Sequence, residues 1–300
     1  MKKEKKKKVL CVGMITAFTV VSLLETGGRE RVSLEAQASE MVTETLNHAT
    51  YYGSGAFDWA SEGKLEFNCG DTYTGELSYG DLNGTGTYTY KNIGTYKGDF
   101  DLGQRAGEGT FSWKDGSTYS GEWYDDCMNG EGVYYSKKKG IKLKGTFIGN
   151  KFTDGALFYK KNGNVYQYWI DNGKFTNKIY IKYKNGSQYT GTYTRTKLTG
   201  TGTIRYKNGD RYSGKLKDGK KSGTGTYRWK NGASYKGSWK NDRMNGKGTY
   251  YYHSSSRGKW LQGSFVNNKP SGTCVYYTRS GSKYKTIWSG GKCTKVERDS

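Results

Sequence analysis

The sequence predicts an all-β protein, an elongated single-layer antiparallel β-meander of about ten hairpin repeats of 23 residues. Three observations lead to this prediction. Aromatic residues make up 15% of the 300 residues although hydrophobic residues reach only 33%, the chain holds 45 glycines and one proline, and a Tyr-x-Gly motif recurs at a nearly constant interval. The chain is too aromatic for a disordered polyelectrolyte and too poor in aliphatic residues for an ordinary two-layer core. We therefore expect a sheet stabilised by contacts between neighbouring rings.

The Tyr-x-Gly motif sets the register of the repeat. It begins at tyrosines 73, 96, 119, 189, 212 and 235, and variants at Leu143, Tyr166, Leu261 and Tyr284 fill the gaps. Successive units therefore start 23 to 26 residues apart. A lone hairpin is marginal in water, so such units must stack on one another to be stable.

Each unit has the pattern of two strands and a tight turn. A large apolar residue lies four positions after the motif tyrosine. Two glycines lie eleven and thirteen positions after it, and alternating aromatic residues follow the second glycine. In one unit these are Tyr212, Leu216, Gly223, Gly225, Tyr227 and Trp229. Alternation with period two predicts strands, and Asn-Gly or Asp-Gly between them predicts a hairpin turn. We expect the glycines to leave room for a ring of the neighbouring strand to lie over the backbone.

These motifs resemble the MORN (membrane occupation and recognition nexus) repeat, in which Tyr-x-Gly-x-Trp precedes Gly-x-Gly-x-Tyr. Tyr119-Ser-Gly-Glu-Trp123 followed by Gly130-Glu-Gly-Val-Tyr134 matches it well. The resemblance covers about residues 61–290 and implies single-layer hairpin sheets that act as scaffolds, dimerisation modules or membrane-associated modules. The units starting at Leu143 and Tyr166 depart from the pattern, because they lack the glycine pair.

The N-terminal segment has the features of an export signal, which indicates a bacterial exported type of the family. Six lysines between positions 2 and 8 precede an apolar run at 9–24, and Ala36-Gln-Ala38 is a small-x-small pattern. The run would span roughly 24 Å as a helix, which is short for a membrane core. The sequence leaves three alternatives open: a cleaved signal, an uncleaved anchor, or a cytosolic protein with an apolar N-terminus. The predicted organisation is an export signal or anchor (1–38), a leader (39–60), the repeat array (61–290) and a tail (291–300).

Charge is segregated along the chain. Residues 39–132 contain 16 Asp and Glu against 5 Lys and Arg, a net charge of −11, whereas residues 133–300 contain 36 Lys and Arg against 7 Asp and Glu, a net charge of +29. Strand parity predicts a basic stripe on the face opposite the rings. The stripe comprises Lys182, Lys184, Arg205, Lys207, Lys215, Lys217, Arg228, Lys230, Lys236 and Lys240.

Two interpretations of this stripe stay open. It can be a solvated face that keeps the sheet soluble. It can instead bind a polyanion, namely an anionic membrane surface, an anionic wall polymer such as teichoic acid, or an acidic protein. The charge separation would also suit self-association, as in a homodimer.

The aromatic residues form a predicted ladder with two interpretations of its own. The rings can pack within the sheet, or they can form a groove for a peptide, a sugar or a partner sheet. The ladder comprises Tyr73, Tyr96, Tyr119, Trp123, Tyr166, Tyr189, Tyr212, Tyr235, Trp239, Tyr284 and Trp288.

No catalytic, metal or cofactor motif stands out. The two histidines, His48 and His253, belong to no Cys/His cluster, and the Gly-x-Gly pairs are repeat glycines rather than phosphate-binding loops. The sequence therefore predicts a non-enzymatic exported scaffold without cofactors. The alternatives are a glycan- or wall-binding module that uses the aromatic groove and, more remotely, a hydrolase with an unrecognised carboxylate site. Basic and aromatic composition would also suit nucleic acid, but export argues against that partner.

Overall fold

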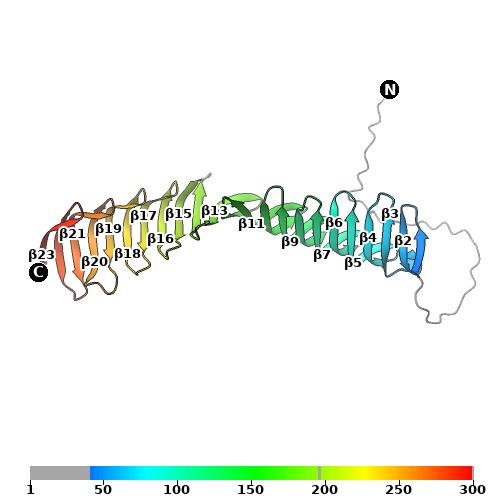
Figure 1. Cartoon of the computed structure of the whole chain (residues 1–300), viewed down its shortest axis with the longest axis horizontal. Coiled ribbons are helices and arrows are strands. Elements are labelled where there is room, and N and C mark those ends of the chain that lie inside the picture. The colour runs from blue at the N-terminus through cyan, green and yellow to red at the C-terminus, as the bar shows by residue number, and fades with distance from the viewer. Residues whose placement is uncertain (1–40, 195–196, 299–300) are drawn as a thin grey trace, which may run out of the picture. The chain divides into compact units, whose positions relative to one another are not determined.

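The computed structural model describes residues 41–194 and 197–298, and strands dominate this part of the chain (Figure 1). The chain divides into two compact units, residues 1–155 (unit 1) and 156–300 (unit 2). The predicted export signal, residues 1–38, lies outside the described residues.

Unit 1 begins with two strands, a 3₁₀ turn (η1, Phe57–Trp59) and a long run of hairpins. Its strands are β1 (Met41–Thr45), β2 (Ala49–Ser54), β3 (Glu62–Phe67), β4 (Thr72–Ser78), β5 (Asp81–Tyr90), β6 (Gly94–Asp101), β7 (Gln104–Trp113), β8 (Thr118–Tyr124), β9 (Cys127–Ser136) and β10 (Ile141–Ile148). Strand β11 (Lys151–Lys161) includes the division between the units.

Unit 2 continues the hairpin pattern. Its strands are β12 (Asn164–Asp171), β13 (Lys174–Lys182), β14 (Gln188–Thr194), β15 (Lys197–Arg205), β16 (Arg211–Lys217), β17 (Lys220–Arg228), β18 (Ser234–Lys240), β19 (Arg243–Tyr251), β20 (Gly258–Val266), β21 (Lys269–Thr278), β22 (Lys283–Ser289) and β23 (Lys292–Arg298).

Strands pair antiparallel with their neighbours in the chain, from β1 to β10 in unit 1 and from β12 to β23 in unit 2. Figure 1 shows the hairpins of each unit side by side. This arrangement confirms the predicted all-β class and hairpin meander.

The strands extend beyond both ends of the predicted array. Segment 39–60, expected as a leader, contributes β1 and β2, and segment 291–300, expected as a tail, contributes β23. The N-terminal extension has its own Tyr-x-Gly motif, Tyr51-Tyr-Gly53, and the Tyr51 side chain is fully buried. Tyr51 thus lies over glycines as the motif tyrosines do, and it precedes Tyr73 by 22 residues.

The tyrosine of each motif explains the glycines around it. The buried ring of Tyr73 lies over Gly75 of its own strand and Gly86 of the next, and a Cβ on Gly86 would lie 2.4 Å from the ring. The Tyr73 hydroxyl donates a hydrogen bond of 2.6 Å to the Glu76 carbonyl. Equivalent bonds of 2.7–3.2 Å fix Tyr96, Tyr119, Tyr189, Tyr212 and Tyr235. A glycine at the crossing point is required because any side chain there would displace the ring.

A β-bulge accompanies this packing. The register of β4 against β5 shifts between Gly75 and Leu77, which leaves Glu76 outside that pairing. On the partner strand, Gly84 takes a positive φ of 62°, a backbone conformation that favours glycine. The two glycines of a unit thus serve different ends, since Gly84 shapes the bulge and Gly86 admits the ring.

Several motif rings also contact the aromatic residue four positions later, the equivalent residue of the next unit, or both. Tyr96 meets Phe100 at 5.1 Å and Trp123 at 5.2 Å between ring centroids, both edge-to-face. In unit 2, Trp239 lies 5.5 Å from Tyr212 and 5.3 Å from Tyr235. Edge-to-face pairs at these distances add about 1 kcal/mol beyond the burial of area. We call the face that carries these six motif tyrosines the ring face, and the opposite one the outer face.

Burial of the motif tyrosines predicts alkaline unfolding. Burial raises the pKa of Tyr119, Tyr189 and Tyr235 from 10 to about 12. Because the folded-state pKa lies above the unfolded value, this stabilisation is complete below pH 10 and is lost as the pH rises through 12. We expect circular dichroism and tyrosinate absorbance to change together between about pH 10 and 12. Full ionisation near pH 10 with an intact β signal would contradict this prediction.

Candidate functional site: the outer face of unit 2

Two cations lie among the rings of the ring face. Arg105 and Lys221 follow their motif tyrosines by nine residues, where other units have Leu82, Met128 or Met244. The Arg105 guanidinium carbon lies 4.5 Å from a Trp123 ring centroid, and the Lys221 Nζ lies 5.2 Å from that of Tyr227. Cation–π attraction contributes about 1 kcal/mol at such sites.

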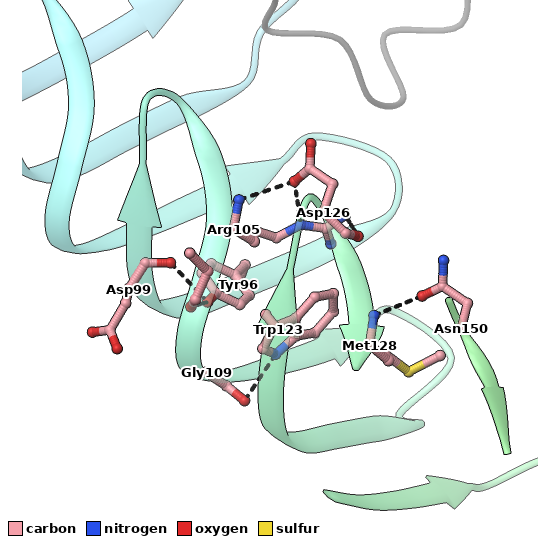
Figure 2. Close-up of polar contacts among 9 residues, drawn as sticks. Tyr96, Asp99, Arg105, Gly109, Trp123, Asp126, Met128 and Asn150 are labelled. Carbon is pink, nitrogen blue, oxygen red and sulfur yellow. Dashed lines mark hydrogen bonds and ion pairs between the residues drawn. The ribbon is translucent and has the colours of Figure 1, made fainter. Parts of the chain in front are cut away.

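Each of these cations has an aspartate from the next hairpin. Arg105 Nε donates to Asp126 Oδ1 at 2.9 Å, and the same oxygen accepts the Arg105 backbone N–H at 3.1 Å (Figure 2). Lys221 has the same partner in Asp242, with its backbone N–H 2.9 Å and its Nζ 3.6 Å from Oδ1.

Where the cation is replaced by methionine, the aspartate is replaced by asparagine. The backbone N–H of Met128 donates to Asn150 Oδ1 at 2.8 Å (Figure 2). That of Met244 donates to Asn268 Oδ1, also at 2.8 Å. In all four hairpins the backbone N–H thus keeps its bond to a side-chain oxygen, and in these hairpins that side chain is a charged aspartate where it faces a cation. The cations of the ring face are therefore neutralised structural elements.

The outer face of unit 2 differs, because an unbroken row of cross-strand partners there brings three arginines together. The row crosses ten strands, β13 to β22, and we call it the outer row. It runs through Lys182, Gln188, Arg205, Arg211, Arg228, Ser234, Tyr251, Trp260, Tyr277 and Lys283.

Three arginines occupy consecutive positions of the outer row. Arg205 lies directly opposite Arg211, which lies directly opposite Arg228, and all three are exposed. None of the three forms an ion pair with any residue in the described ranges 41–194 and 197–298. Like charges directly opposite each other destabilise a sheet.

The repeat fold does not require cations at these positions. The equivalent row of unit 1 is mostly threonine and serine: Thr72, Thr89, Thr95, Ser112 and Thr118. Threonine has a high strand propensity, so it would also suit unit 2. The arginine row is therefore a feature of unit 2 that the fold alone does not explain.

The outer row continues into three aromatic residues. Tyr251 has 41% of its surface exposed, and the rings of Trp260 and Tyr277 are half-buried. The Trp260 and Tyr277 centroids lie 3.6 Å apart with an angle of 33° between the planes. A ring platform thus follows the arginines on the same line.

A trough of about 780 Å³ lies beside the outer row on the outer face. Lys236 and Lys247 line it together with hydroxyl and amide side chains, and Tyr251 belongs to both the trough and the row. Unit 1 has an equivalent trough of about 590 Å³, lined by threonines and glycines with Lys97 and Glu108. The two troughs share their form and differ in charge.

Carboxylates on the outer face of unit 1 have a structural role at the bulges. Glu76 accepts the Thr85 backbone N–H at 3.1 Å, Asp99 that of Glu108 at 2.9 Å, and Glu122 that of Glu131 at 3.0 Å. Hydrogen bonds from the Thr85 hydroxyl and backbone lower the pKa of the Glu76 carboxyl. These bonds give three of the unit 1 carboxylates a structural role at the bulges.

The structure divides the predicted basic stripe into several locations. Lys182, Arg205 and Arg228 lie in the outer row. Lys215 and Lys236 lie farther along their strands, opposite Thr201 and Thr226. Lys217 and Lys240 lie at the strand ends away from the row. Strand parity predicted the face but not the position along each strand.

Three members of the predicted stripe are turn residues, which corrects their predicted place on the face. Lys184, Lys207 and Lys230 lie in the hairpin turns, and their stems stack against Gly163, Gly186 and Gly209 of the preceding turns. The prediction also missed Arg211 and Lys247. Arg211 directly precedes Tyr212 in the same strand, so the alternation of faces along the strand would have placed it on the outer face.

The predicted aromatic ladder lies mainly in the packed interior of the ring face. The six motif tyrosines are fully buried, and Trp123 and Trp239 are nearly so. The indole N–H groups of these two donate to the carbonyls of Gly109 and Gly225, both at 3.1 Å. Tyr166, Tyr284 and Trp288 are half-buried.

Among the described residues, no helix is long and apolar enough to cross a membrane. The apolar run at 9–24 lies outside them. Across the same described ranges, no three His, Cys, Asp or Glu residues are grouped as metal ligands.

A family model described as the MORN repeat matches the chain seven times. The matches cover residues 73–92, 96–118, 119–140, 189–211, 212–234, 235–257 and 262–283, together more than half of the chain. A search of curated proteins finds no match.

Two solved structures show limited similarity. One is the SAS-4 (dCPAP) TCP domain of Drosophila melanogaster in complex with a proline-rich motif of Ana2 (dSTIL), with 15% identity, 64% of this chain and 90% of that chain covered, and a TM-score of 0.24. The other is a streptogramin B lyase, with 9% identity, 85% and 92% covered, and a TM-score of 0.15.

Proposed function

Because the chain belongs to the MORN repeat family, we propose that it is a non-enzymatic repeat scaffold that binds an anionic partner through the outer face of unit 2. The proposal includes export, with this face presented outside the cytoplasm. It is supported there by the basic segment and the apolar run at 9–24 that precede the repeats.

The observation that carries the proposal is the row of three arginines, which have no counter-ion among the residues that the structure describes. Arg205, Arg211 and Arg228 repel one another across adjacent strands, although unit 1 shows that the same positions accept threonine or serine. A bound anion would turn this repulsion into attraction. Guanidinium groups suit this task, since each presents a planar fork of N–H donors to phosphate or carboxylate oxygens.

Ring-face cations support the proposal by contrast. Arg105 and Lys221 each have an aspartate 21 residues later, so the same chain neutralises a cation where the charge serves packing. The outer arginines form no ion pair within the described part of the chain and remain exposed to solvent.

The test is binding of the full chain to immobilised inorganic polyphosphate. A variant that carries Arg205→Thr, Arg211→Thr and Arg228→Ser copies the residue types of unit 1. We expect its affinity to fall roughly a hundredfold at low salt, since three charge-assisted contacts are lost. The affinity of the natural chain should itself decrease as salt is added.

A matched control removes the same charge from the opposite ends of the strands. It carries Lys217→Thr, Lys220→Thr and Lys240→Thr, and its affinity should fall by less than about threefold. Equal losses in the two triple variants would show that only total charge matters and would overturn the proposal.

A further inference from the structure

We propose that the trough of unit 2 and the outer row form one site for a linear polymer of polyols or sugars joined by phosphodiesters. The inference rests on the proposed function and specifies its ligand. In this site the chain lies across the strands, with phosphates on the arginines and hydroxyl groups in the trough.

The trough and the row are close enough to hold one ligand. Ser213 and Thr226 line the trough two residues along the strands from Arg211 and Arg228, a separation of about 7 Å. Tyr251 belongs to both features. A chain that crosses the strands therefore meets cations on one side and the trough on the other.

Spacing favours a repeating anion. Neighbouring strands lie about 4.8 Å apart, so the three consecutive arginines span about 10 Å. Lys236 and Lys247 add two exposed cations inside the trough, and neither forms an ion pair within the described chain. Anionic groups along a single chain can thus meet charges in the row and in the trough.

The lining of the trough favours a polyhydroxylated chain. Thr226, Thr249 and Gln262 contribute hydroxyl and amide groups to its surface. These groups donate and accept hydrogen bonds, which matches the hydroxyls of a polyol or sugar. At the far end of the row, Tyr251 and Trp260 offer ring surface to the apolar C–H groups of such a chain.

Shape and stacking argue against two other polyanions. A flat bilayer contacts the highest points of a surface, whereas Lys236 and Lys247 line a hollow. A single-stranded nucleic acid binds mainly by stacking its bases on rings, whereas the trough is lined by hydroxyl, amide and glycine residues and two lysines, with Tyr251 as its one aromatic residue.

Unit 1 is an internal control for this site. Its trough has threonines at the positions equivalent to Thr226 and Thr249, namely Thr87 and Thr110. It also contains Glu108, which lies directly opposite Glu122. Opposed carboxylates repel phosphate, so we expect the polymer to bind unit 2 alone.

The experiment measures binding of the full chain to poly(glycerol phosphate) by isothermal titration calorimetry at fixed salt. A variant with Thr226→Val, Thr249→Val and Gln262→Val keeps the charge and the strand propensity but removes polar groups from the trough. We expect it to lose about tenfold in affinity for this polymer. The equivalent unit 1 variant, with Thr74→Val, Thr87→Val and Thr110→Val, should bind as the natural chain does.

Three other probes identify the ligand class. Inorganic polyphosphate has no hydroxyl groups to offer the trough, so its affinity should be the same for both valine variants. Tighter binding of oligo(dT) or of vesicles of phosphatidylglycerol than of poly(glycerol phosphate) would overturn the inference. Unchanged polymer binding by the unit 2 valine variant would also overturn it. The arginine variant tests the proposed function separately, through polyphosphate alone.

Discussion

Replacement of Gly225 by alanine is expected to destabilise unit 2 by about 3 kcal/mol, the upper range for overpacking of a core. A Cβ at this position would lie 2.4 Å from the Tyr212 hydroxyl oxygen and 2.6 Å from its ring. The ring cannot move away easily, because it is fully buried and its hydroxyl donates to the Lys215 carbonyl at 2.7 Å. The backbone is also confined, since Gly214 lies directly opposite.

Urea unfolding followed by circular dichroism measures this effect. Gly219→Asn is the control, because Gly219 has a positive φ of 80° and no atom within 4 Å of its Cβ position. Asparagine tolerates this backbone conformation, so the control should cost less than about 1 kcal/mol. A Gly225→Ala variant as stable as its parent would contradict the assigned role of the glycine pair.

Asp126→Asn is expected to destabilise unit 1 by about 2 kcal/mol, and Arg105→Met added to it is expected to restore most of that loss. The single change leaves a guanidinium, whose side chain is only 16% exposed, without its carboxylate. Removal of one partner of a buried pair costs more than the pair contributes, and partial exposure reduces that cost here. The double variant reproduces the Met128–Asn150 arrangement that the chain already contains.

The same exchange in unit 2 provides an independent control. Asp242→Asn should cost less than Asp126→Asn, because Lys221 Nζ lies 3.6 Å from its aspartate whereas Arg105 Nε lies at 2.9 Å. The free energies of unfolding of each single and double variant form a double-mutant cycle. A double variant less stable than Asp126→Asn alone would refute the matching of charge across hairpins.

Repetition made most of the fold predictable from the sequence. Because one motif recurs ten times, it determines where the strands and turns lie and which residues face each side of the sheet. Its glycines indicate where rings cross the backbone. The sequence did not indicate the strands at residues 41–54, because this segment lacks the glycine pair and the large residue four positions after Tyr51. The segment is nevertheless paired along β2 with β3.

The candidate site was less predictable, because it depends on the register between strands. Parity places Arg205 and Arg228 on the outer face, but only the pairing shows that Arg211 lies between them. Bulges shift the pairing within most hairpins, so residues at equal offsets in two strands do not always meet. The partner of Arg105 lies 21 residues away in the next hairpin, and only the folded chain reveals it.

Matching across hairpins has a consequence for shortening or lengthening the array by recombination. A cation nine residues into one unit depends on an acid in the turn of the next, so a 23-residue segment that begins at its tyrosine is not self-contained. Deletion of residues 119–142 would place Asn150 where Arg105 needs Asp126. A graft that keeps each charged pair together must be cut after the acid rather than before the tyrosine. The segments that can be exchanged without separating a charged pair therefore begin and end after the acid, so their boundaries are offset from those of the Tyr-x-Gly repeats.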